Sequence, residues 1–136
     1  MCSSDLWARW VAWASAAGDV GNQTRQVLSS LSHEGAALAV HESNGGMSAG
    51  NGSVMRNPPV ALWTADAPLE DMVALATAQA TLTHHDEHNS FGAAIHAGML
   101  RAGLHGRDVF AAIEEVLAVL PPQADRKSTR LNSSHT

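Results

Sequence analysis

The chain has 136 residues, of which 45% are hydrophobic, a proportion that suits one packed domain or a part of one. Its 13 acidic and 8 basic residues give a formal net charge of −5, which argues against nonspecific binding to nucleic acid or to an anionic membrane surface. The single cysteine, Cys2, excludes a disulfide framework and a cysteine-based metal site, and it fits a reducing, cytoplasmic location. No apolar run approaches the length that spans a membrane.

The two ends of the chain differ from the rest. Residues 1–6 and 126–136 resemble translated sequencing-adaptor sequence, and the C-terminal stretch holds only one apolar residue in eleven. Such a stretch buries too little surface to offset the entropy lost on ordering. We therefore expect an adaptor-like leader at 1–6, a partial domain at 7–125 and an adaptor-like, disordered tail at 126–136.

Hydrophobic spacing predicts helices along nearly the whole chain, and no alternating strand pattern of useful length occurs. The first helix ends at Gly18, and its tryptophans, Trp7, Trp10 and Trp13, are expected in the core. Later apolar stripes mark helices around residues 27–31, 36–40, 69–76, 91–102 and 109–120. Residues 60–63 are apolar and follow two prolines, and the pattern leaves their structure open. The sequence predicts an all-α fold.

The most informative stretch is 48–59, which contains the sequence Gly50-Asn51-Gly52, called the glycine turn below. Glycines can adopt positive φ and let a ligand approach the backbone, and asparagine tolerates the left-handed region. Ser53 can cap the element that begins there, beside free backbone N–H groups. Arg56 can bind a phosphate or pair with a local carboxylate. We interpret this stretch as a candidate site for an anionic or polyhydroxylated ligand.

A second candidate is the histidine-rich stretch at residues 83–88. His84, Glu87 and His88 fit the H-x-x-E-H pattern of inverted zinc proteases, in which two histidines one helical turn apart hold zinc and the glutamate activates water. This interpretation requires a helix across residues 84–88. The alternative is a polar connection followed by a helix that is capped by Asp86, Asn89 or Ser90.

Residues 48–56 followed by 59–62 resemble the central motif of the ADP-ribosylglycohydrolases. Residues 19–25 and the later Thr83-His84, which precedes an alanine-rich helix, are also similar to that family and occur in the same order. The resemblance implies a multi-helix, all-α domain, of which this chain holds the central portion. It implies two Mg²⁺ ions in the intact domain and hydrolysis of the glycosidic bond that joins ADP-ribose to a protein side chain or a small acceptor.

The resemblance also implies where the ligand binds. The partner would be ADP-ribose or an ADP-ribosylated protein, held by backbone and side-chain groups of the central motif and by the later histidine. The implied substrate-binding residues are Gly50, Asn51, Gly52, Ser53, Met55, Arg56 and His84.

The chain departs from the family in its acidic motifs. The Thr-Asp-Asp-type and Asp-x-Asp-Thr-type strings that hold the metal ions in the family do not occur here. We therefore assign no catalytic and no metal-ligating residue, and we expect an internal fragment that is inactive by itself. Two alternatives remain: a noncatalytic, crystallin-like member of the same fold, and the zinc metalloprotease.

Overall fold

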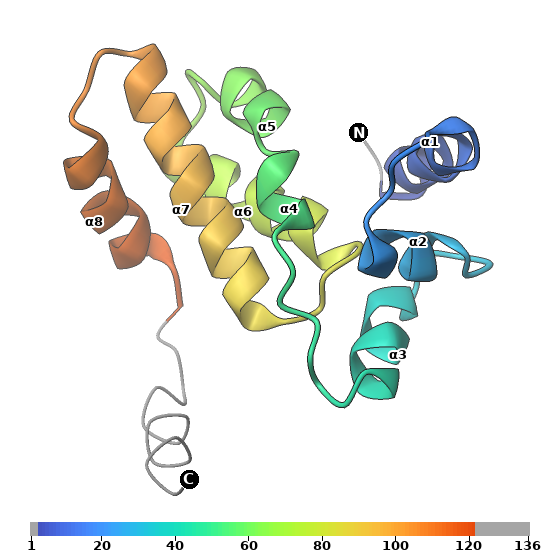
Figure 1. Cartoon of the computed structure of the whole chain (residues 1–136). Coiled ribbons are helices and arrows are strands. Elements are labelled where there is room, and N and C mark those ends of the chain that lie inside the picture. Colours follow the sequence, from blue (N-terminus) through green and yellow to red (C-terminus); the bar gives the residue numbers. More distant parts are fainter. Residues whose placement is uncertain (1–2, 122–136) are drawn as a thin grey trace, which may run out of the picture.

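The computed structural model describes residues 3–121, and over this span the chain forms eight α-helices and no β-strand (Figure 1). The predicted all-α class is confirmed. The first helix begins inside residues 1–6, which were expected to be a leader, whereas the expected tail at 126–136 lies outside the described residues. The helices are α1 (Ser3–Ala16), α2 (Asn22–Leu28), α3 (Ala36–Ser43), α4 (Gly52–Met55), α5 (Pro58–Trp63), α6 (Leu69–Thr81), α7 (Glu87–Leu104) and α8 (Val109–Val119).

The larger core lies among α5, α6, α7 and α8, with α7 between α6 and α8 (Figure 1). Small side chains on the facing surfaces let these helices approach closely. Gly98 of α7 shows how closely, because a Cβ atom there would lie 2.5 Å from Val116 Cγ2. The buried members of this core are Val60, Met72, Val73, Ala76, Ala94, Ala97 and Val116.

A smaller core joins α1, α2 and α3, and its buried members are Trp7, Val27, Leu28, Ala36, Ala37 and Val40. Helix α2 ends at Leu28, so Leu31, expected in its buried stripe, is fully exposed. The tryptophan prediction is correct for Trp7, which is 7% exposed, and wrong for Trp13, which is 50% exposed. Val11 is also exposed, so this core leaves part of the apolar surface of α1 uncovered.

The two cores meet across polar contacts. Gln23 Nε2 of α2 donates to the Thr83 carbonyl at 3.1 Å, and Asn89 Nδ2 of α7 donates to the Ser48 carbonyl at 3.0 Å. Residues 60–63, whose structure the sequence left open, belong to helix α5. The two prolines occupy its first turn, where a backbone N–H would have no intrahelical partner in any case. No helix within residues 3–121 is both long enough and apolar enough to cross a membrane.

Candidate functional site

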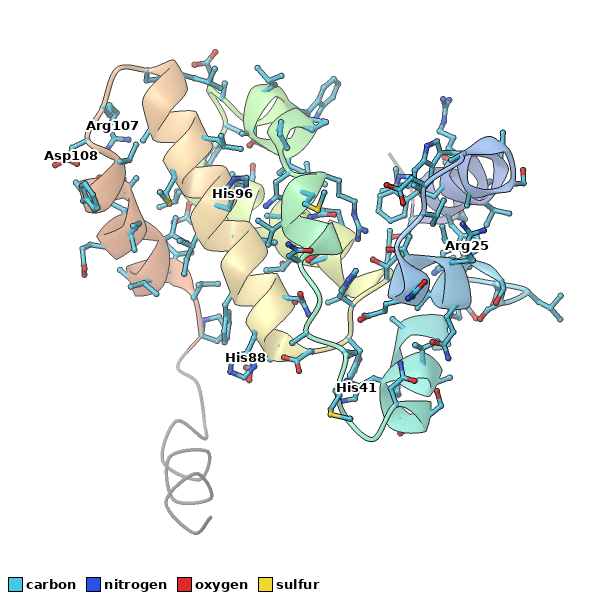
Figure 2. All side chains as sticks on the ribbon, in the orientation of Figure 1. Arg25, His41, His88, His96, Arg107 and Asp108 are labelled. Atoms are coloured by element: carbon cyan, nitrogen blue, oxygen red, sulfur yellow. The ribbon has the colours of Figure 1, made fainter. Side chains whose placement is uncertain are left out.

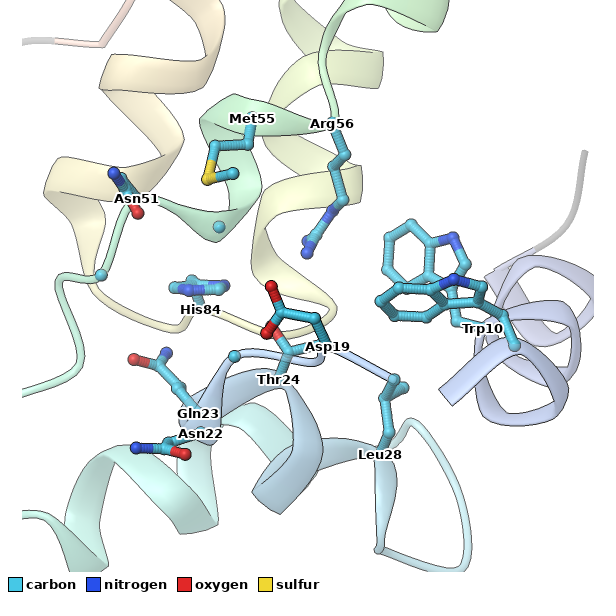
Figure 3. Close-up of a pocket in the computed structure, with 14 residues that line it drawn as sticks. Trp10, Asp19, Asn22, Gln23, Thr24, Leu28, Asn51, Met55, Arg56 and His84 are labelled. Atoms are coloured by element: carbon cyan, nitrogen blue, oxygen red, sulfur yellow. The ribbon is translucent and has the colours of Figure 1, made fainter. Parts of the chain in front are cut away.

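A cavity of about 680 Å³ lies between the two cores (Figure 3). One side is formed by α1 and by residues 19–28, and the other by the glycine turn, the start of α4 and the loop before α7. The structure brings six of the seven expected binding residues to this cavity: Gly50, Asn51, Gly52, Met55, Arg56 and His84. Residues far apart in the sequence therefore converge on one space.

The glycine turn adopts a different backbone from the one predicted. Neither glycine has positive φ, and Asn51, with φ −88°, is the N-cap of α4 and lies outside the left-handed region. The glycines are needed for space instead, because the His84 ring packs against them. A Cβ atom on Gly52 would lie 3.1 Å from His84 Cε1, and one on Gly50 would lie 3.5 Å from His84 Nε2.

Ser53 was expected to cap α4 and to face the ligand, and both expectations are wrong. Asn51 is the N-cap and Ser53 lies inside the helix. The Ser53 side chain is fully buried, is absent from the cavity wall, and its Oγ has no hydrogen-bond partner within residues 3–121. Asn51 and Gly52 line the cavity, and the backbone amide of neither residue has an acceptor in the described chain.

Arg56 is held by neutral groups. Its Nε donates to Gln79 Oε1 at 2.6 Å, and its Nη2 donates to the Gln79 carbonyl at 2.7 Å and to Thr83 Oγ1 at 2.6 Å. Pairing with a local carboxylate, one of its two predicted roles, is not seen in the described chain. Burial lowers the pKa of Arg56 to about 10, so the guanidinium stays charged at neutral pH. Its Nη1 makes no hydrogen bond to residues 3–121.

Trp10 is half-buried: it packs against the smaller core, where it was expected, and it also lines the cavity. Its ring lies under Arg56, with 4.3 Å between the guanidinium carbon and the ring centroid. This is a cation–π contact, which is stronger where water is partly excluded. Trp10 and Trp13 together make one side of the cavity aromatic (Figure 3).

His84 lies between α6 and α7, buried against the glycine turn. Its Nδ1 is 2.7 Å from Thr83 Oγ1. Burial, and then the positive charge of Arg56, lowers the pKa of His84 from 6.5 to about 4. The imidazole is therefore neutral at physiological pH.

Asp19 is a cavity residue that sequence reasoning missed. It is exposed, lies in the turn before α2, and faces the cavity beside Thr24 and across from Arg56 (Figure 3). Gln23 also lines this wall. The only signal in the sequence was the family resemblance of residues 19–25, since an aspartate beside a glycine is ordinary turn chemistry.

The zinc protease interpretation is wrong, because residues 84–88 are not one helix. Helix α7 begins at Glu87, and Asp86 is its N-cap, accepting from the His88 amide at 2.9 Å. The capping alternative is thus confirmed, with Asp86 as the cap. His88 is exposed at the start of α7 (Figure 2), whereas His84 is buried. The Nδ1 atom of His88 lies 2.8 Å from Asp86 Oδ1.

The described residues do not fit a metal centre of the kind the family resemblance implies. Within residues 3–121, no three histidine, cysteine, aspartate or glutamate side chains are placed to hold a metal ion. Asp19 is the one carboxylate on the described cavity wall. One carboxylate is too few for two Mg²⁺ ions, which prefer several oxygen ligands.

The family model of ADP-ribosylglycohydrolase matches residues 2–135. Comparisons with curated proteins and with solved structures find no match. The match spans both cores and every residue of the cavity wall.

Proposed function

The chain belongs to the ADP-ribosylglycohydrolase family, and from this premise we propose that its cavity binds the ADP-ribose group of an ADP-ribosylated protein or small acceptor. The reaction served would be hydrolysis of the glycosidic bond between ADP-ribose and that acceptor. The observation that carries the proposal is the convergence of the glycine turn, Arg56 and His84 on one cavity.

The size and the two-sided character of the cavity support this ligand. About 680 Å³ lies within the range of small-molecule sites. On one side, Trp13, which is 50% exposed, offers an aromatic face on which a purine base can stack, next to Trp10, whose ring lies under Arg56. ADP-ribose has an adenine base at one end and two riboses joined by a diphosphate. The ligand therefore also has an aromatic part and a polar part.

The polar side offers mainly hydrogen-bond donors. The Asn51 and Gly52 amides have no acceptor within the described chain, and Arg56 keeps its charge and an unpaired Nη1. Donors of this kind suit the oxygens of a diphosphate. Asp19 and Gln23 offer oxygens that can accept from ribose hydroxyls. The donors and acceptors thus match the two polar parts of ADP-ribose.

The two Mg²⁺ ions expected from the family remain a proposal for the intact domain. When bound, such ions supply Lewis-acid and orienting chemistry. Their ligands would have to come from outside residues 3–121, since the described side chains do not form a metal site. We therefore propose that this chain binds ADP-ribose without cleaving its conjugates.

Isothermal titration of the full chain with ADP-ribose, AMP and ribose 5-phosphate tests the proposal. ADP-ribose should bind at least about tenfold more tightly than either part, because only the whole ligand reaches both sides of the cavity. His84→Ala should weaken binding, whereas His85→Ala should not, because the exposed His85 is not on the cavity wall.

Two results would count against the proposal. A folded chain that does not bind ADP-ribose would refute the assignment of the cavity. Release of ADP-ribose from a modified protein by the chain alone would refute the expected lack of hydrolysis, and it would show that the described residues suffice for catalysis.

A further inference from the structure

Thr83, which directly precedes His84, is completely buried, and its amide, carbonyl and hydroxyl all make hydrogen bonds. Its Oγ1 lies 2.6 Å from Arg56 Nη2 and 2.7 Å from His84 Nδ1. Its carbonyl accepts from Gln23 Nε2 at 3.1 Å. One residue thus connects three parts of the cavity wall.

The direction of these hydrogen bonds follows from the chemistry of the groups. A guanidinium can only donate, so Thr83 Oγ1 accepts from Arg56. The hydroxyl has one hydrogen, and its oxygen has no third partner within residues 3–121. That hydrogen is therefore directed at His84 Nδ1, which must be an acceptor. A neutral imidazole that accepts at Nδ1 carries its own hydrogen at Nε2.

We propose that Thr83 is a positioning residue whose hydroxyl, oriented by Arg56, holds His84 as the Nε2–H tautomer. His84 Nε2 lies against the glycine turn, 3.4 Å from the position of a Cβ atom on Gly52. The cavity therefore presents a neutral N–H donor at this point. Such a donor suits an oxygen of the ligand, and an imidazole of the opposite tautomer would offer only a lone pair there.

The tautomer can be read directly from the ring nitrogens. We would record two-bond ¹H–¹⁵N correlations of the histidine rings in the ¹⁵N-labelled full chain near neutral pH. The His84 signal is identified by its loss in His84→Gln. The wild type should show a protonated Nε2 and an accepting Nδ1. Thr83→Val should lose the Nδ1 hydrogen bond and bring the two nitrogen shifts closer, and Thr83→Ser should restore the wild-type pattern.

Thr81→Val is the matched control, because Thr81 is exposed on the last turn of α6 and its hydroxyl bonds only to the Ala78 carbonyl. Its His84 spectrum should equal that of the wild type. A protonated Nδ1 in the wild type, or an unchanged His84 pattern in Thr83→Val, would overturn the proposal. If Thr83→Val does not fold, the wild-type and Thr83→Ser spectra still decide which nitrogen carries the hydrogen.

The effect on ligand binding rests on the proposed function. ADP-ribose affinity should fall roughly tenfold in Thr83→Val, the effect of losing about one hydrogen bond, and should stay within about twofold of wild type in Thr83→Ser. Equal affinity in Thr83→Val and the wild type would overturn the positioning role. Lack of ADP-ribose binding by the wild type would instead refute the proposed function, while the spectra would still decide the tautomer.

Discussion

The substitution Gly52→Ala tests whether the turn requires glycine for its backbone conformation or for the space beside His84. The added Cβ atom would lie 3.1 Å from His84 Cε1, 3.4 Å from His84 Nε2 and 3.5 Å from Thr24 Oγ1. The backbone itself accepts alanine, because φ is not positive and Gly52 is the first residue of α4. Alanine stabilises a helix by about 0.5–1 kcal/mol relative to glycine. A displaced imidazole rotamer costs about 0.5–1.5 kcal/mol.

These two terms nearly cancel, so the free energy of unfolding should change by less than about 1 kcal/mol. Ligand binding should respond more strongly. The ring can turn only slightly, because it is buried and its Nδ1 lies 2.7 Å from Thr83 Oγ1, and even a small turn changes how the imidazole faces the cavity. The methyl group also occupies the cavity wall. We expect ADP-ribose affinity to fall about tenfold or more, a loss of roughly 1.4 kcal/mol.

Urea unfolding and isothermal titration of the same preparations measure both effects. Gly50→Ala is the matched control, because its Cβ atom would lie 3.5 Å from His84 Nε2, an ordinary contact distance, and its φ is also not positive. Its effect on affinity should be clearly smaller. Wild-type affinity in Gly52→Ala would refute the steric reasoning. A loss of several kcal/mol in the free energy of unfolding of Gly52→Ala would show that the His84 ring cannot yield to the methyl group, and it would refute the estimate that the two terms nearly cancel.

Three further predictions concern the charge state of the site and the core. Because the folded chain lowers the pKa of His84 from 6.5 to about 4, the unfolded chain binds a proton first as the pH falls. The contribution of neutral His84 to the free energy of unfolding is fully present above about pH 6.5. It is lost between about pH 6.5 and 4, by on the order of 3 kcal/mol. Urea unfolding of His84→Gln should therefore show a weaker pH dependence than that of the wild type. Arg56→Lys should lower the free energy of unfolding by roughly 2 kcal/mol in urea titrations, since one ammonium cannot keep all three of the Arg56 hydrogen bonds; an unchanged value would contradict this. Gly98→Ala should destabilise by about 1–3 kcal/mol through overpacking against Val116, and adding Val116→Ala should recover part of that loss in thermal unfolding; independent, additive effects would contradict the contact.

The helices could be predicted from the sequence because their apolar residues repeat at helical spacing, and the long stripes of α6, α7 and α8 lie where expected. Short elements were harder to predict. Leu31 continues the spacing of Val27 and Leu28, yet it is exposed because α2 ends at Leu28. Spacing records where an apolar side chain would point if the helix continued, and it does not record where the helix ends.

The candidate site could be predicted in its membership but not in its geometry. The stretch around the glycine turn predicted Arg56 as a binding residue, and the resemblance at Thr83-His84 predicted His84; the structure brings both to one cavity. The sequence did not show whether a glycine is required because its φ is positive or because a neighbouring side chain leaves no room for a Cβ atom. Both requirements select the same residue type. Ser53 and Trp13 were misplaced for a related reason: which face of a helix is buried depends on distant segments.

The polar side of the cavity is fixed mainly from the α6 and α7 side. Gln79 of α6 accepts twice from Arg56, and its own Nε2 donates to the Ser53 carbonyl at 2.9 Å and to Asn57 Oδ1 at 2.7 Å. Asn57 in turn donates to the Ala93 carbonyl of α7 at 2.6 Å. This buried chain of hydrogen bonds connects the residues around α4 to the larger core.

The aromatic side is attached differently. Trp10 belongs to α1, which packs in the smaller core, and it touches the polar side through its contact with Arg56. Because Arg56 donates hydrogen bonds to Gln79 and Thr83, its guanidinium is held in place, and the Trp10 ring can stack against it. Contacts with α6 and α7 thus fix the donors on one side of the cavity. The position of α1 sets the distance between these donors and the aromatic side chains. Under the proposed function, a base would therefore contact the α1 side of the cavity, and a diphosphate would contact donors that α6 and α7 hold in place.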